Sequence, residues 1–334
     1  MKRILLCLSW LLLLMSFTNC IDAQRTKAVP AIIFDTDMGP DYDDLGAIAV
    51  LYALEARKEC KVLATLSSNG HPAIAPTIEL LNRYFNRGEV PVGIAGPTAP
   101  AFTHKSGWNE ALIQRFAPEL RSKQYPYAVE IYRRILSQQP DRSVTIVTVG
   151  FLSNINDLLH SEPDTYSKLS GVDLVKKKVK QWVAMAADFP QGREFNVYKD
   201  TTAAYQALAL WPQDVPIVFS GFDIGSRIRT GKRLAEQFPQ TPIGMGYAIN
   251  FSAVPEKGNG RQSWDQTAVL CAVRTPEKYF YVIGPGKIEV SKDGSNIWNP
   301  NANANHFFLV HKYPYAQIEN LLEELMMYQP SAKL

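Results

Sequence analysis

The sequence lacks any strong imbalance of charge. Its 334 residues include 35 Lys and Arg against 32 Asp and Glu, which gives a net charge of +3. Proteins that bind nucleic acid usually carry a clear excess of basic side chains, so this class of protein is not indicated. The densest basic run, Lys176 to Lys178, is interpreted as the solvated face of a helix.

Cysteine is also scarce, with four residues in the whole chain. Cys7 and Cys20 belong to the N-terminal apolar region, which leaves Cys60 and Cys271. Two cysteines make no disulfide framework, although a single bond between them is possible in an exported protein. Cys271 lies in an apolar run and is interpreted as a small buried side chain.

No internal repeat, low-complexity tract or Gly/Ser/Pro-rich linker divides the chain. A chain of 334 residues that is 46% apolar is long enough to bury a substantial core. We therefore predict a signal peptide over residues 1–23, followed by a single domain over residues 24–334.

The N-terminal apolar run, Ile4 to Phe17, follows two basic residues. It is shorter than the ~20 residues that a spanning helix needs, and its length is typical of a signal peptide. Cleavage after Ala23 would export the protein to the periplasm or the medium. Lipid attachment at Cys20 is the alternative, although Asn19 is bulky and polar where a lipoprotein signal has a small residue.

Strand-length apolar runs alternate with helical patterns along the rest of the chain. Runs that are apolar at consecutive positions are typical of strands buried on both faces of a parallel sheet. We expect strands over Ala31–Phe34, Lys61–Leu66, Val90–Ile94, Val144–Val149, Trp182–Met185 and Ile217–Ser220. We expect helices over Leu45–Arg57, Ala75–Phe85, Tyr127–Gln138, Asn154–Ser161 and Thr201–Leu210. The pattern predicts a single-domain α/β fold, a mostly parallel open sheet flanked by helices.

The stretch Phe34 to Ala47, FDTDMGPDYDDLGA, follows the first predicted strand and contains five aspartates, Asp35, Asp37, Asp41, Asp43 and Asp44. Neighbouring carboxylates disfavour joint ionisation unless a cation neutralises them. Capping of the following helix would need one or two aspartates, so a hard cation bound through oxygen explains the stretch better. The stretch is no EF-hand loop, because no glutamate stands at the twelfth position.

This stretch resembles the signature of the inosine-uridine preferring nucleoside hydrolases, a DxDxG at a strand end followed by paired aspartates, with two extra residues after Gly39. Four further segments resemble the family in the family's order. They are Leu66–His71, Val147–Asn154, Met185–Asn196 and Ser263–Val269. The resemblance covers about Ile32 to Val273 and implies the Rossmann-like nucleoside hydrolase fold.

The resemblance also implies a calcium-dependent hydrolysis of ribonucleosides to ribose and free base, in which Asp37 activates a metal-bound water. The implied metal ligands are Asp37, Asp44, Asp265 and the backbone carbonyl of Val149. The implied substrate-binding residues are Asp43, Asn69, Met185, Asp188, Glu194, Asn196 and Trp264. Asp35 and Asp41 would orient the neighbouring carboxylates, but the two extra residues leave open whether Asp41 or Asp43 contacts the sugar.

The sequence departs from the family most clearly at Trp264, where many members have a histidine that protonates the leaving base. Tryptophan cannot deliver a proton but can stack on an aromatic base. Other candidates for the leaving-group side are Tyr247, Phe251, Arg261, Gln262, His71 and His104. Two alternatives stay open: hydrolysis of a non-nucleoside riboside or other glycoside, and a non-catalytic calcium-dependent sugar-binding protein. Family members commonly form homodimers or homotetramers, so either assembly is implied by resemblance alone.

Overall fold

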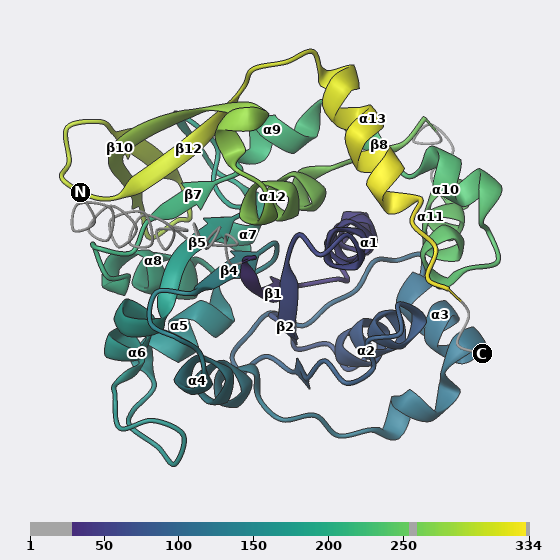
Figure 1. Ribbon diagram of the computed structural model, residues 1–334, viewed down its shortest axis with the longest axis horizontal. Helices are drawn as coiled ribbons and strands as arrows, with labels where there is room; N and C mark the ends of the chain where they lie inside the picture. Colours follow the sequence, from purple (N-terminus) through teal and green to yellow (C-terminus); the bar gives the residue numbers. More distant parts are fainter. Residues whose placement is uncertain (1–28, 254–258, 332–334) are drawn as a thin grey trace, which may run out of the picture.

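A computed structural model describes residues 29–253 and 259–331 (Figure 1). The predicted signal peptide and the alternative lipid site at Cys20 lie outside the described residues. Cys60 and Cys271 are both buried and free, so the disulfide considered from the sequence is not formed. Within the described ranges, no helix is both long and apolar enough to cross a membrane.

A ten-stranded sheet forms the centre of the molecule, in the order β3-β2-β1-β4-β5-β7-β12-β10-β11-β6 (Figure 1). Neighbours from β3 to β12 pair in parallel, whereas β10, β11 and β6 continue the sheet in antiparallel pairs. The parallel strands are β1 Ala31–Thr36, β2 Lys61–Ser67, β3 Val92–Gly93, β4 Val144–Thr148, β5 Val179–Ala184, β7 Ile217–Phe219 and β12 His306–His311. The others are β6 Gln191–Gly192, β10 Phe280–Val290 and β11 Asn296–Asn299.

All six predicted strands are present in this sheet, but the third is shorter than expected. The segment Val90–Ile94 forms only β3, because Pro91 has no backbone N–H to donate. Ile94 instead bonds to the chain before α4: its N–H donates to the carbonyl of Pro126, and its own carbonyl accepts from Ala128. The mostly parallel α/β class predicted from the sequence is confirmed.

Helices cover both faces of the sheet and bury two separate apolar clusters. On one face lie α1 Asp43–Ala56, α2 Ile74–Tyr84, α12 Trp264–Val273 and α13 Tyr315–Met326. On the other face lie α4 Ala128–Gln138, α5 Ser153–His160, α6 Gly171–Lys178 and α8 Thr201–Leu210. The five predicted helices correspond to α1, α2, α4, α5 and α8 within a few residues.

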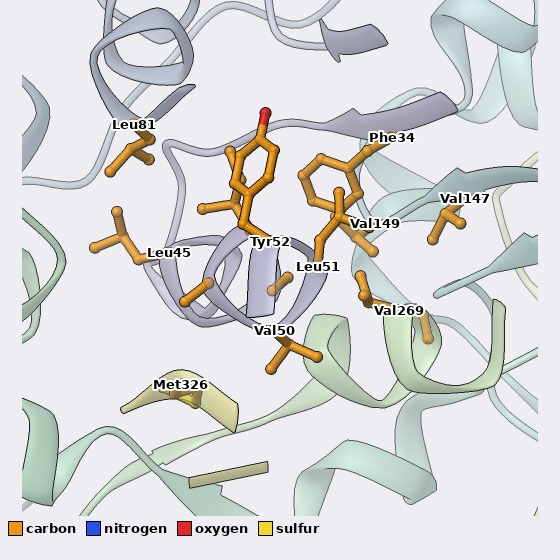
Figure 2. Packing of buried hydrophobic residues seen from close by; sticks show 14 of the residues in the cluster. Phe34, Leu45, Val50, Leu51, Tyr52, Leu81, Val147, Val149, Val269 and Met326 are labelled. Atoms are coloured by element: carbon orange, nitrogen blue, oxygen red, sulfur yellow. The ribbon is translucent and has the colours of Figure 1, made fainter. Parts of the chain in front are cut away.

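Helix α1 is apolar on every side and lies in the middle of its layer. A helix with this composition belongs in the interior, and its residues from Asp43 to Leu54 are all buried. Figure 2 shows side chains from β1, α2, α12 and α13 around it, including Phe34, Leu81, Val269 and Met326. The tight packing fixes the start of α1, where Asp43 and Asp44 stand.

The remaining elements connect or extend these layers. The helices are α3 Trp108–Phe116, α7 Phe195–Lys199, α9 Phe222–Ser226, α10 Lys232–Gln237 and α11 Pro242–Ala253, with 3-10 turns η1 Pro118–Ser122 and η3 Pro276–Lys278. A separate two-stranded ribbon pairs β8 Arg229–Thr230 with β9 Arg261–Gln262. This ribbon leads directly into α12, so it controls how the chain enters that helix.

Candidate active site

The carboxyl ends of the parallel strands meet at one edge of the sheet. The N–H of Val149 donates to the carbonyl of Asp35 at 2.8 Å, and the N–H of Met185 donates to Thr148 at 2.8 Å. These bonds align the residues that follow β1, β4 and β5. In open α/β sheets, ligands bind beyond this edge.

A cavity of about 360 Å³ opens at this edge. It is lined by Asp37, Asp41, Asp43, Val149, Met185, Asp188, Arg193, Glu194, Phe195, Asn196, Tyr198, Phe222, Arg261, Trp264 and Asp265. Residues that are 228 positions apart in the sequence, Asp37 and Asp265, thus face one space. Most of the predicted site residues line it, whereas Asp35, Asn69 and Asp44 lie behind the wall.

Three carboxyl groups lie close enough together to hold a cation. One oxygen each from Asp41, Asp44 and Asp265 falls within 4.8 Å of the others. Asp44 is fully buried; its Oδ1 accepts from the Thr36 hydroxyl and from the N–H of Met38. Its Oδ2 is buried without a hydrogen-bond donor from the described residues. Buried polar atoms are rarely left unpaired, so a cation fits this position.

Asp37 lies on the tight turn that follows β1 and lines the cavity. It is 4% exposed. Burial, together with the carboxyl groups of Asp44 and Asp41, raises the pKa of Asp37 well above its usual range. The pKa of Asp265 is raised in the same direction by burial and by Asp43. A cation among these groups would favour their ionised forms.

The turn itself is held by buried polar contacts. Met38 has a φ of 26°, in the left-handed region that non-glycine residues rarely adopt. Besides the bond to Asp44, its N–H approaches Thr36, and its carbonyl accepts from the Asn109 amide at 2.9 Å. These bonds hold the loop in a strained conformation that directs Asp37 toward the cavity.

Asp43 is buried at the start of α1 and contacts the start of α12. Its Oδ2 accepts from the N–H of Trp264 at 3.1 Å and from that of Asp265 at 3.4 Å. Its Oδ1 accepts from Arg261 Nε at 3.1 Å, while Arg261 Nη2 binds Asp41 at 2.6 Å. The aspartate stretch is therefore already paired with one buried guanidinium.

Asp35 lies on β1 itself and supports the site from behind. Its carboxyl group accepts from the Tyr132 hydroxyl at 2.8 Å and from the Asn154 amide at 3.1 Å. Burial raises the pKa of Asp35 to about 7, and the two hydrogen bonds oppose this rise. Asn154 also donates to the carbonyl of Ser67, which links the ends of β1 and β2 through one side chain.

The segment after β5 forms the wall opposite the aspartates. Glu194 caps α7 and accepts from the N–H groups of Ala187 at 3.0 Å and Asn196 at 2.9 Å. Burial raises the pKa of Glu194 to about 7. The Asn196 amide donates to the carbonyls of Met185 at 3.1 Å and Val149 at 3.3 Å. The Val149 carbonyl, which is predicted to bind a metal, therefore accepts a hydrogen bond from Asn196, a predicted sugar-binding residue.

Asp188 is half-buried in the same wall, and the C-terminal extension of the sheet holds its backbone. The Asn296 side chain accepts from its N–H at 3.1 Å and donates to its carbonyl at 2.6 Å. Asn296 belongs to β11, an element that the sequence analysis did not anticipate. The carboxyl group of Asp188 remains at the cavity, where its pKa is raised by burial.

Asn69 is placed differently from the other predicted substrate residues. Its amide donates to the backbone carbonyls of Asp37 at 3.0 Å and Phe102 at 2.8 Å. It is buried behind the cavity wall and braces the loop that carries Asp37. His71 and His104 also lie outside the lining described above.

Aromatic side chains form the outer part of the cavity. Trp264 and Phe222 stack with their ring centroids 5.4 Å apart, and the indole N–H donates to the Phe222 carbonyl at 2.7 Å. Arg193 lies 4.3 Å above the centre of the Tyr198 ring. Phe222, Tyr198 and Arg193 line the cavity but were not predicted from the sequence. The only available signal was that Arg193 and Tyr198 flank the predicted sugar-binding segment.

Together, the fold and site define a class: α/β proteins with a buried acidic centre at the carboxyl edge of a parallel sheet. The chain matches the family described as inosine-uridine preferring nucleoside hydrolase over residues 32–307. The chain belongs to this family, whose members hydrolyse the N-glycosidic bond of ribonucleosides. The family resemblance predicted from five ordered segments is confirmed.

Individual relatives are more distant. An uncharacterised protein of Schizosaccharomyces pombe is 30% identical over 237 residues, which cover 65% of this chain and 69% of that protein. The pyrimidine-specific ribonucleoside hydrolase RihA of Escherichia coli is 28% identical, over 63% of this chain and 66% of its own length. The matches thus span about two thirds of these relatives.

Solved structures resemble the fold over nearly the whole chain. A plant nucleoside hydrolase, PpNRh1, superposes with a TM-score of 0.65 and 20% identity, covering 89% of this chain and 98% of its own. A purine-preferring ribonucleoside hydrolase from Gardnerella vaginalis gives a TM-score of 0.63 and 16% identity, with 89% and 98% coverage. At this identity the likeness establishes the fold alone.

Proposed function

We propose that this protein is a calcium-dependent nucleoside N-ribohydrolase in which Asp37 is the general base. One observation carries the proposal: Asp37 lines the cavity beside a three-carboxylate group whose member Asp44 has a buried oxygen without a donor. The Asp37 carboxyl group is well placed to take a proton from a water molecule in the cavity. General-base catalysis of this kind contributes ~10²–10⁴-fold to a rate.

The donor set fits a hard cation, because all of its candidate atoms are oxygen. Asp37, Asp44, Asp265 and the carbonyl of Val149 are the ligands that the family resemblance implies, and calcium accepts six to eight such oxygens. A bound calcium ion supplies Lewis acidity, which favours loss of a proton from water and orients sugar hydroxyls. The raised pKa values of Asp37 and Asp265 support this assignment, because burial and the neighbouring carboxyl groups raise them and a cation would favour the ionised forms.

The charge balance favours cleavage of an N-ribosyl bond. The site contains five carboxyl groups, those of Asp37, Asp41, Asp43, Asp44 and Asp265, and one buried guanidinium, that of Arg261, which pairs with Asp41 and Asp43. When a divalent cation is bound, the ionised site keeps a net negative charge. Positive charge develops at the anomeric carbon in the transition state, and preorganised negative charge stabilises it.

Glu194 and Asn196 would bind the sugar on the opposite wall, with Met185 and Asp188 beside them. The leaving base would lie toward Trp264, which can stack on an aromatic ring but cannot protonate it. RihA is described as pyrimidine-specific and the Gardnerella enzyme as purine-preferring, so the family alone does not select a base. A non-nucleoside riboside remains the alternative substrate, and a non-catalytic sugar-binding protein the alternative function.

The experiment is a reducing-sugar assay across purine, pyrimidine and non-nucleoside ribosides, with calcium present or removed by a chelator. We expect ribose release that stops on chelation and falls at least ~10²-fold in Asp37→Ala. Asp141→Ala, a change at an exposed surface carboxylate paired with Lys178, is the matched control and should keep full activity. Full activity in Asp37→Ala, or indifference to the chelator, would contradict this mechanism.

We also propose export, supported by the apolar run Ile4 to Phe17 behind two basic residues. Fractionation of cells that express the full chain would place the protein in the periplasm or medium. Retention in the membrane fraction that is abolished by Cys20→Ser would instead indicate the lipoprotein.

A further inference from the structure

The two extra residues after Gly39 bring Asp41 and Asp43 into different surroundings. Both oxygens of Asp43 are engaged, one by Arg261 and the other by the backbone N–H groups at the start of α12. Asp43 is 1% exposed. A carboxylate with these partners stabilises the first turn of a helix, because it satisfies N–H groups that have no partner within the helix.

Asp41 has a different set of contacts. Its Oδ2 binds Arg261 Nη2 at 2.6 Å, and its side chain is 37% exposed, so this carboxylate is less enclosed than that of Asp43. Asp41, unlike Asp43, belongs to the group of three carboxylates with Asp44 and Asp265. A carboxylate held by a guanidinium on one oxygen keeps the other oxygen available to a cation.

The position of Asp41 is fixed by its neighbours on both sides. Tyr42 is 3% exposed and packs edge-on against Tyr247 and Phe251, with ring centroids 5.4 Å and 6.0 Å away. The Arg261 guanidinium lies between two rings, 5.1 Å from the centre of Tyr42 and 5.0 Å from that of Trp264. Arg261 therefore has little freedom, and the carboxylate that it binds is oriented with it.

An unpaired buried oxygen of Asp44 also indicates a cation at this position, independently of the contacts of Asp41. Asp44 is fully buried, with 0% relative exposure. Its Oδ2 receives no hydrogen bond from any of the described residues. Asp41 and Asp265 each bring an oxygen within 4.8 Å of an Asp44 oxygen. A cation between the three groups would satisfy this atom.

We propose that Asp41, supplied by the two-residue insertion and oriented by Arg261, is a ligand of the cation together with Asp44 and Asp265. Asp43 is then a positioning residue that caps α12, and it does not accept a hydrogen bond from the 2′-hydroxyl of the sugar. The inference rests on the proposed function, because it assigns residues within the same metal site. It departs from the roles that the family resemblance implies for these two aspartates.

The test is a calorimetric titration of the full chain with calcium chloride, in the wild type and in the single variants Asp41→Asn, Asp43→Asn and Asp44→Asn. Asp41→Asn and Asp44→Asn should each weaken calcium binding by at least ~10–100-fold, which is the cost of losing a group that only supports a metal ligand. Asp43→Asn should bind calcium within about threefold of the wild type but unfold at a lower temperature, because the charge-assisted hydrogen bonds to Arg261 and to the start of α12 are lost.

The opposite pattern, with affinity lost in Asp43→Asn and kept in Asp41→Asn, would overturn the inference while leaving the proposed function intact. If the wild type binds no calcium, both fail. A second measurement is independent of the calcium affinity. It is the ratio of kcat/KM for a ribonucleoside to kcat/KM for its 2′-deoxy analogue. We expect Asp43→Asn to leave this ratio unchanged, and a fall of tenfold or more would restore Asp43 as the partner of the 2′-hydroxyl.

Discussion

The two walls of the cavity are built on different principles. The aspartate wall comes from strand ends and from the buried start of α1, and Asp37, Asp44 and Asp265 are each at most 4% exposed. The aromatic wall comes from short helices and their flanks, and Phe222 is 42% exposed. One wall is fixed by the sheet and the core. The other is more exposed, and it touches the aspartate wall where Trp264 packs against Arg261.

This difference separates the chemistry from the choice of substrate. Positions at strand ends are held by backbone hydrogen bonds, which suits groups that bind a cation and move a proton, because catalysis depends on accurate positioning. Aromatic side chains on exposed elements suit recognition of a leaving group, because stacking tolerates different rings.

Removing the buried guanidinium should do the most damage to the aspartate wall. Arg261→Met leaves Asp41 and Asp43 without their cation, and breaking a buried ion pair from one side typically costs about 3–5 kcal/mol. We expect the free energy of unfolding to fall by an amount within this range. Urea unfolding in the presence of a chelator measures the loss. Calcium should recover part of the loss, because it supplies positive charge to the same carboxylates.

The control for Arg261→Met is Arg227→Met, which removes an exposed guanidinium paired with Asp223 and should change stability by less than ~1 kcal/mol. If both variants unfold alike in the chelator, the guanidinium has no special role in the acidic wall.

A single added methyl group should disturb the same wall. In Gly150→Ala, the new Cβ would lie 2.3 Å from the backbone nitrogen of Asp37 and 2.7 Å from its Cβ, so the loop must shift. Misplacing a reacting group by about 1 Å can cost ~10²-fold in rate. We expect a fall of that order in kcat for ribose release.

Gly70→Ala is the matched control, since its Cβ would meet its nearest neighbours at an ordinary 3.5 Å. Equal activity of the two alanine variants would mean that the position of Asp37 tolerates displacement, against the rigid wall described above.

Much of the aspartate wall could be predicted from the sequence, because strands buried on both faces appear as consecutive apolar residues and their ends carry the polar groups. The β-α alternation and the aspartates after β1 were found in this way, whereas the residues after β4 and β5 were assigned by the family resemblance. The C-terminal strands β10, β11 and β12 were missed. Their exposed apolar side chains, such as Tyr281 and Ile283, give no clear pattern of burial.

The pairing of Arg261 with the aspartates could not be read from the sequence, because 220 positions separate Arg261 from Asp41. The same holds for the support of Asp35 by Asn154, at a separation of 119 residues. Local patterns locate strand ends, whereas the packing of α12 against α1 decides which side chains meet across them.

Changes in the aromatic wall should be milder and should depend on the substrate. Trp264→Ala removes a stacking surface worth ~1–3 kcal/mol for a nucleobase. We expect kcat/KM to fall about tenfold for nucleosides and less for a riboside with a non-aromatic leaving group. The measurement is the ratio of the two kcat/KM values in the wild type and the variant.

Trp264→Phe keeps an aromatic ring and serves as the conservative comparison for this change. A uniform loss across aromatic and non-aromatic leaving groups in Trp264→Ala would place Trp264 with the aspartate wall instead.

The smallest effect concerns the pH dependence of stability at Glu194. Burial raises the pKa of Glu194 to about 7 in the folded protein, above its ordinary value of 4.5. A carboxyl group with a raised folded pKa binds its proton more tightly in the folded state, so the folded protein loses stability as pH rises from about 4.5 to 7.

Glu194→Gln cannot titrate, and it should flatten this slope even though it loses an acceptor for the N–H groups at the start of α7. Chemical unfolding of both proteins in a chelator, at several pH values over this window, measures the difference. The loss of the acceptor lowers the stability of the variant by a constant amount, so only the slope reports the proton. Parallel curves of stability against pH for the two proteins would mean that Glu194 stays ionised in the folded protein over this whole pH window. The wall that carries Glu194 would then be as well solvated as the aromatic wall.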